Sequence, residues 1–175
     1  MATAIHRWTY FTDLSPGTLR SRAELFMEST PWSRLLTFAA ERGMGGELLP
    51  AVGLGHNHMV RIIEGTSSNR WIVRLELPPI SATTCSEHYL QARRDNEVNV
   101  VTLLRQKTTI RIPEIYACDS GHAIGVPFTI LEYLPGNVGM DMAMSIPSDQ
   151  KSKIIRGLAH IHVSTSLLSF STGSC

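Results

Sequence analysis

The chain of 175 residues is long enough for one domain, and a part of a larger fold fits that length equally well. Hydrophobic residues make up 43% of it and charged residues 18%, which argues against intrinsic disorder. The 16 Lys and Arg residues against 15 Asp and Glu residues leave a formal charge of +1, which excludes a basic field for nucleic acid or an anionic membrane. Any anion site must therefore be local.

The first ten residues include His6 and Arg7, where a signal peptide would need an uninterrupted apolar stretch. No later run approaches the roughly 18 apolar residues of a membrane span. The cysteines lack C-x-x-C spacing and indicate a reducing compartment: Cys85, Cys118 and Cys175. We therefore expect a soluble, cytoplasmic protein without membrane partners.

Residues 30–43, TPWSRLLTFAAERG, predict an amphipathic helix with Pro31 at its first helical position. Its apolar residues recur at helical spacing: Trp32, Leu35, Leu36 and Ala39. A weaker apolar stripe predicts a preceding helix over 19–27. Residues 1–43 are thus expected to form a helical N-terminal extension.

Residues 48–77 alternate short apolar runs with glycine and Ser/Asn punctuation, which predicts three antiparallel strands near 48–54, 58–64 and 70–77. In the third, Trp71, Val73 and Leu75 share one face by the period of two. Arg74 then projects from the opposite face.

Residues 97–107, EVNVVTLLRQK, place Val98, Val101, Leu103 and Leu104 on one side of a helix. Two further strands are predicted near 114–118 and 127–133, joined by a turn at 119–125. Pro147 and Ser148 open a last helix after a linker. The stripe of that helix is expected to be buried: Ile154, Leu158 and Ile161. The order indicates an α+β fold with a five-stranded antiparallel sheet.

The turn after the first strand reads Gly53-Leu54-Gly55-His56-Asn57-His58. A glycine-containing hairpin lets backbone N–H groups approach a phosphate closely. A plain β-turn is the alternative, because glycine is the default turn residue.

Arg74 on the third strand and Glu97 at the start of the helical stripe fit a second pattern. In kinase-type phosphoryl transfer, a cation on the third strand contacts the nucleotide phosphates and a helix carboxylate holds it. An exposed arginine and a solvated glutamate are the alternative. Lysine is commoner in this place, but the planar fork of arginine can bind phosphate in bidentate fashion.

The segments GLGHNHMVRIIEG, RWIVRLELP, EVNVVTLL, IRIPEIYACD and GVPFTILEYLPGNV together resemble the phosphotransferase enzyme family, specifically its fungal members, over roughly residues 31–170. Those proteins are similar to aminoglycoside and choline kinases. The resemblance implies a protein kinase-like, nucleotide-binding N-lobe over 44–135, and a linker with the first helix of a truncated C-lobe over 136–175. It implies a loop covering the nucleotide, a phosphate-binding cation with its helix partner, and a hinge beside the adenine. The implied residues are, in that order, Gly53, Gly55, His56 and Asn57, then Arg74 and Glu97, then Glu132, Tyr133 and Leu134.

Full-length relatives are implied to use ATP and magnesium to phosphorylate a small-molecule hydroxyl of unknown identity. The family's catalytic segment H-x-D-x-x-x-x-N and the aspartate that follows it do not occur in these 175 residues. We therefore assign no catalytic residue, and we expect the chain alone to be truncated, to bind ATP weakly or not at all, and to be inactive.

Two histidine pairs, His56 with His58 and His160 with His162, lack nearby Cys, Asp or Glu partners, so we expect no protein-bound metal. A different function remains open: a non-catalytic, pseudokinase-like module that binds nucleotide or a protein. An incompletely covered last helix would then favour self-association. Nucleic-acid binding through the turn is opposed by the near-neutral charge.

Overall fold

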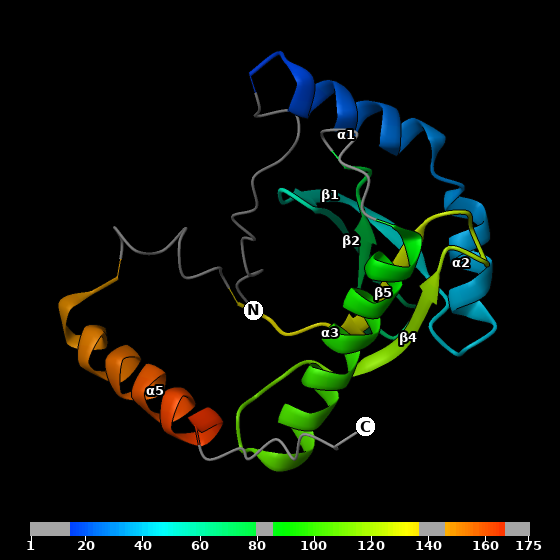
Figure 1. Ribbon diagram of the computed structural model, residues 1–175. Coiled ribbons are helices and arrows are strands. Elements are labelled where there is room, and N and C mark those ends of the chain that lie inside the picture. Colours follow the sequence, from blue (N-terminus) through cyan, green and yellow to red (C-terminus); the bar gives the residue numbers. More distant parts are fainter. Residues whose placement is uncertain (1–14, 80–85, 137–145, 167–175) are drawn as a thin grey trace.

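The computed structural model describes residues 15–79, 86–136 and 146–166, and it confirms the α+β fold (Figure 1). The strands form a single five-stranded antiparallel sheet in the order β1-β2-β3-β5-β4. Their bounds are β1 Glu47–Leu54, β2 His58–Glu64, β3 Arg70–Glu76, β4 Ile115–Ser120 and β5 Pro127–Glu132. Each predicted strand boundary is confirmed to within two residues. This is the architecture of a kinase-like N-lobe.

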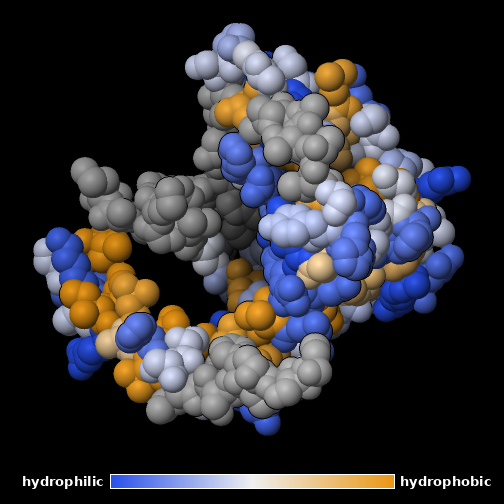
Figure 2. All heavy atoms as spheres, viewed as in Figure 1, coloured by the Kyte–Doolittle hydropathy of each residue, from blue (hydrophilic) through white to orange (hydrophobic). Residues whose placement is uncertain are grey.

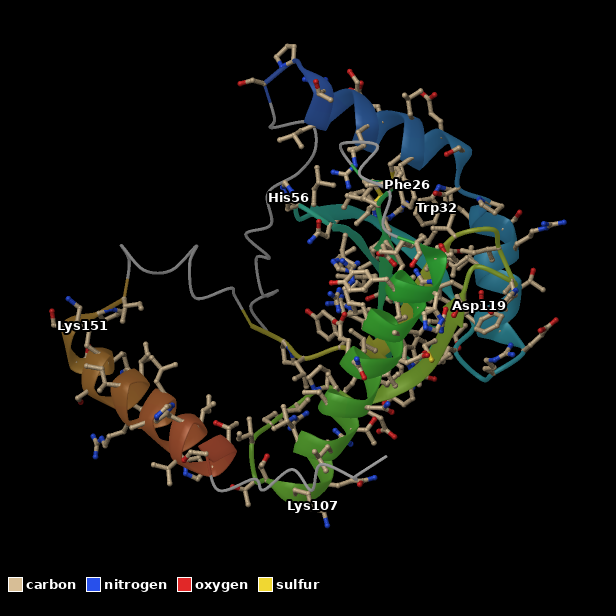
Figure 3. All side chains as sticks on the ribbon, in the orientation of Figure 1. Phe26, Trp32, His56, Lys107, Asp119 and Lys151 are labelled. Atoms are coloured by element: carbon tan, nitrogen blue, oxygen red, sulfur yellow. The ribbon has the colours of Figure 1, made fainter. Side chains whose placement is uncertain are left out.

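Two N-terminal helices, α1 (Thr18–Ser29) and α2 (Trp32–Ala40), pack on one face of the sheet. Phe26 and Trp32 lie where these helices meet the strands (Figure 3). Pro31 is the residue before α2 and not its first helical residue, because its ψ of 73° is not helical. The prediction was wrong by that one position. Both helices therefore belong to the same apolar core as the sheet.

The core face of the sheet follows the predicted alternation. Val73 and Leu75 are fully buried, and the ring of Phe128 on β5 meets that of Phe38 edge to face at 5.1 Å. Arg61 is buried in the same layer, where its Nη2 donates to the Leu49 carbonyl at 2.8 Å. Burial lowers the pKa of this guanidinium. The intervening residues of β2 and β3 face the other side.

Helix α3 (Glu87–Lys107) lies on that other side, where Glu97 contacts Arg74. It begins ten residues before the predicted stretch, and the Ser86 side chain caps it by accepting from the Tyr89 N–H at 3.3 Å. Its apolar stripe is half-buried, and α3 has no fully buried residue. Helix α3 thus covers the sheet more loosely than α1 and α2 do.

The turn between β4 and β5 is held by Asp119, whose Oδ1 accepts from the backbone N–H groups of Gly121 at 2.8 Å and Ala123 at 3.0 Å. Gly121 and Gly125 have positive φ values of 105° and 79°. Cys118 beside this turn is a free, exposed thiol. Cys85 and Cys175 lie outside the described residues.

Helix α5 (Ser148–Ser166) begins where it was predicted and lies to one side of the sheet (Figure 1). The prediction of a buried stripe was wrong: Ile154, Leu158 and Ile161 are 41%, 61% and 42% exposed. No element among the described residues covers this stripe, so its apolar side chains have no packing partner there. No helix in the described part of the chain is long and apolar enough to cross a membrane.

Candidate functional site

Arg74 and Glu97 form the centre of the site. Arg74 leaves β3 on the face that carries α3, and its Nη1 donates to Glu97 Oε1, so the predicted contact is confirmed. The two side chains keep 31% and 46% of their surface exposed. An ion pair at such exposure stabilises a fold by at most about 1 kcal/mol. The pair therefore serves to orient the guanidinium more than to hold the fold together.

His58 contacts the same guanidinium from β2. Arg74 Nη2 lies 3.3 Å from His58 Nδ1. Arginine only donates, so a hydrogen bond at this distance requires Nδ1 to be the unprotonated nitrogen of a neutral imidazole. Burial, followed by the charge of Arg74, lowers the pKa of His58 from its ordinary value, which favours the neutral form of the ring.

A second set of ion pairs lies beside the Arg74–Glu97 pair. Glu76 on β3 accepts hydrogen bonds from Arg93 and Arg94 of α3, the latter at 3.1 Å. Arg94 also donates to Glu87. Ion pairs thus tie the first half of α3 to β3, and they explain why a stretch without an apolar stripe is helical and docked here.

A cavity of about 170 Å³ lies between α3 and strands β3, β4 and β5. Arg74 and Glu97 line it together with apolar side chains from both layers, among them Val98, Val101 and Leu131. The predicted turn and hinge residues do not line it. The cavity therefore includes the ion pair but not the turn and the hinge that were predicted to surround the nucleotide.

The predicted covering turn links β1 to β2. Gly53 pairs with Val60 in the sheet, and the Gly55 N–H donates to the His58 carbonyl at 2.9 Å. His56 lies at the tip of this hairpin (Figure 3), and its carbonyl accepts from Arg22 Nη1 of α1 at 3.0 Å. The Asn57 carbonyl accepts from the Leu77 N–H at 2.9 Å. Contacts with α1 and with the end of β3 thus hold the turn in place.

Gly55 is not required by the conformation of the turn. Its φ lies outside the left-handed region, and an added Cβ would meet only the His58 carbonyl oxygen, at an ordinary 3.6 Å. Neither the conformation of the turn nor its packing therefore requires a glycine at position 55.

The predicted hinge follows β5. Glu132 pairs with Trp71 in the sheet, and its carboxylate accepts from the Glu114 N–H at 3.1 Å and from Arg111 at 2.8 Å. The Glu114 hydrogen bond is the first cause of the lowered pKa of Glu132, and Arg111 adds to it. The Glu132 carboxylate is thus occupied by protein, and a ligand here would contact the hinge backbone.

Tyr133 and Leu134, the other two predicted hinge residues, are half-buried. The Tyr133 ring lies 5.6 Å from the guanidinium carbon of Arg70 at the start of β3. Arg74 lies four residues further along that strand, on the order of 13 Å away at the usual rise. The structure thus places the hinge and the cation toward opposite ends of β3.

Sequence reasoning missed His58 as a neighbour of Arg74 and chose His56 in its place. The signal that could have found it is pairing: His58 lies opposite Glu76, so it shares a face with Arg74 two residues away. That pairing depends on the length of the β2–β3 turn, which apolar periodicity does not encode.

Comparison with known protein families gives one match. The model of the phosphotransferase enzyme family matches residues 49–168, from β1 through the whole of α5. No curated protein and no solved structure matches the chain.

Proposed function

The chain belongs to the phosphotransferase enzyme family, and we propose that residues 44–135 form the nucleotide-binding lobe of an ATP-dependent kinase for a small-molecule hydroxyl. The observation that carries the proposal is the Arg74–Glu97 pair on the sheet face below the β1–β2 turn. A cation held by a carboxylate is pre-oriented for phosphate oxygens and needs no rearrangement when they arrive.

In this proposal Arg74 binds the nucleotide phosphates. Arginine has five N–H donors in a planar fork, and the contacts with Glu97 and His58 use two nitrogens without exhausting them. The turn from Gly53 to Asn57 covers the phosphates with its backbone, and the hinge backbone after Glu132 contacts the adenine. The protein's part in such chemistry is mainly positioning and electrostatic stabilisation.

Magnesium accompanies ATP in the proposed reaction of full-length relatives. Among the described residues, no group of three or more His, Cys, Asp or Glu side chains could hold a metal ion. Proteins usually hold magnesium through one or two carboxylates together with substrate phosphates and water, so in this proposal the contribution of the described lobe is the arginine cation.

We propose further that the 175-residue chain alone binds nucleotide weakly and transfers no phosphate. The supporting observation is that its sequence contains no H-x-D-x-x-x-x-N segment, which supplies the base and an asparagine ligand in kinases. A nucleotide held from one side stays hydrated, so affinity on the order of 0.1–1 mM is expected.

The test is calorimetric titration of ATP and ADP into the chain, with ADP formation followed against aminoglycosides, choline and simple sugars. Arg74→Ala should lower affinity about ten-fold, the usual scale for one charge-assisted contact. Arg20→Ala is the matched control, since Arg20 pairs with Glu24 on α1 and is 34% exposed against 31% for Arg74. Equal binding by wild type and Arg74→Ala would contradict the phosphate role, and turnover would contradict inactivity.

A second candidate function is a non-catalytic module that associates through α5. Figure 2 shows the apolar side chains of this helix at the surface, and Ile155, Leu158 and Val163 are 65%, 61% and 55% exposed. Exposed apolar clusters mark interaction surfaces. Light scattering of Ile155→Glu/Leu158→Glu against wild type tests it: a wild-type chain that stays monomeric at all concentrations rules out self-association.

A further inference from the structure

The His58 imidazole contacts Nη2 of Arg74, whereas Glu97 contacts Nη1. We propose that neutral His58 is a positioning residue for Arg74, so that the phosphate-binding unit is Glu97–Arg74–His58. The hydrogen-bond distance of 3.3 Å and the register of β2 with β3 carry this inference. Its consequence for nucleotide affinity rests on the proposed function, whereas the Arg74–His58 coupling itself does not.

The geometry holds the guanidinium from two elements at once. Glu97 accepts from Nη1 and belongs to α3, which has no buried residue. His58 Nδ1 contacts Arg74 Nη2. His58 belongs to β2, which is paired with a strand on each side. His58 therefore ties the cation to the more rigid layer, and Arg74 stays in place when α3 shifts.

The protonation state of His58 decides whether this contact exists. In this contact the neutral imidazole accepts at Nδ1 and carries its proton on Nε2. Imidazolium has no acceptor and would place a second positive charge beside Arg74. Lowering the pH therefore removes the contact and turns it into repulsion.

Charged groups from both neighbouring elements face the ring. Arg74 and Glu76 come from β3, and Arg93 and Glu97 come from α3. Burial lowers the His58 pKa most, Arg74 and Arg93 lower it too, and the two glutamates raise it. Because the folded pKa lies below the ordinary value, the contact is intact at neutral pH and is lost as pH falls through that lowered value.

The first experiment needs no nucleotide. Nitrogen-15 NMR of the full chain titrates the His58 ring, assigned with His58→Asn. We expect an unprotonated Nδ1, a His58 pKa that rises in Arg74→Ala, and one that falls in Glu97→Gln. A ring protonated on Nδ1, or a pKa that does not respond to Arg74→Ala, would overturn the inference.

The second experiment measures ADP affinity of side-chain variants from about pH 5.5 to about pH 7.5, the range in which histidine titrates. The amide oxygen of His58→Asn replaces Nδ1 without titrating, so it should keep wild-type affinity at the upper pH and lose the pH dependence. His58→Gln places its amide where Nε2 was, and His58→Leu has no acceptor, so both should bind about five-fold more weakly. Dividing each ADP affinity by that of His58→Asn at the same pH cancels the effect of protonation of the nucleotide itself.

The two failures are distinguishable. If the wild type binds no nucleotide while Arg74→Ala raises the His58 pKa, the proposed function fails and the positioning stands. If nucleotide binding depends on Arg74 but is equal in His58→Asn and His58→Gln at every pH, the positioning fails and the function stands. If His58→Leu does not fold, the comparison of His58→Asn with His58→Gln still decides the test.

Discussion

The two faces of the sheet differ in what holds them to their helices. Val73 and Arg74 are neighbours in β3, yet Val73 is 0% exposed in the apolar core and the Arg74 side chain is 31% exposed in an ion pair. Helices α1 and α2 add fully buried residues to the first face, whereas α3 adds none to the second. Burial of apolar surface is the main stabilising term in folding. The first face therefore carries stability, and the second is available for chemistry.

Both ion pairs and half-buried apolar side chains dock α3. Its ion pairs with β3 are those of Glu97 with Arg74 and of Glu76 with Arg93 and Arg94. Each partly exposed pair contributes up to about 1 kcal/mol and weakens with salt. Glu97 can therefore change its distance from the sheet at a small cost in free energy, which suits the role proposed for α3 of orienting Arg74 toward a phosphate.

The largest expected effect separates the two faces by stability. Leu35→Ala in α2 removes a fully buried side chain from the first face and should lower the free energy of unfolding by about 2–5 kcal/mol. Val101→Ala in α3 removes two half-buried methyl groups and should cost about 1 kcal/mol. Urea unfolding followed by circular dichroism measures both.

High salt sharpens this test. Salt screens the ion pairs of α3, and in Val101→Ala the docking of α3 depends more on those pairs because an apolar contact is lost. Roughly 1 M sodium chloride should therefore lower the free energy of unfolding of Val101→Ala by more than that of Leu35→Ala. Equal losses of stability in the two variants would show that α3 is packed as firmly as α2. The comparison between the faces would then be wrong.

The strands and the Arg74–Glu97 contact were predictable because they follow from local pattern. The alternation of Trp71 to Glu76 assigns each side chain to a face, and the apolar stripe after Glu97 turns that carboxylate toward the sheet. The family resemblance supplied the order of the elements, and the match over residues 49–168 agrees with it.

Three features lay beyond local pattern. The start of α3 at Glu87 depends on Arg93 and Arg94 meeting Glu76, a contact that has no sequence period. The position of His58 depends on the register of β2 with β3. The exposure of α5 depends on what lies against it, and an apolar stripe indicates an inward face without naming its partner.

The smallest expected change in stability is at Gly55, in the turn between β1 and β2. Gly55→Ala adds a Cβ at an ordinary 3.6 Å from the His58 carbonyl oxygen, so the free energy of unfolding should change by no more than about 0.5 kcal/mol. If the turn covers the phosphates, the same methyl group stands where the ligand approaches, and ADP affinity should fall about three- to ten-fold. Calorimetric titration and thermal unfolding of one sample give both numbers.

Gly46, just before β1, is the matched control because the close packing of the backbone there leaves no room for a side chain. A Cβ there would lie 2.7 Å from the Glu64 carbonyl carbon and 2.9 Å from Gly65 Cα, both backbone atoms that cannot turn aside. Gly46→Ala should therefore lose about 2–4 kcal/mol of stability, while the fraction that remains folded keeps its ADP affinity. The two glycines should respond in opposite ways, one in binding and the other in folding. Unchanged ADP affinity in Gly55→Ala would make its glycine an ordinary turn residue and would leave Arg74 as the sole phosphate contact that the described lobe supports.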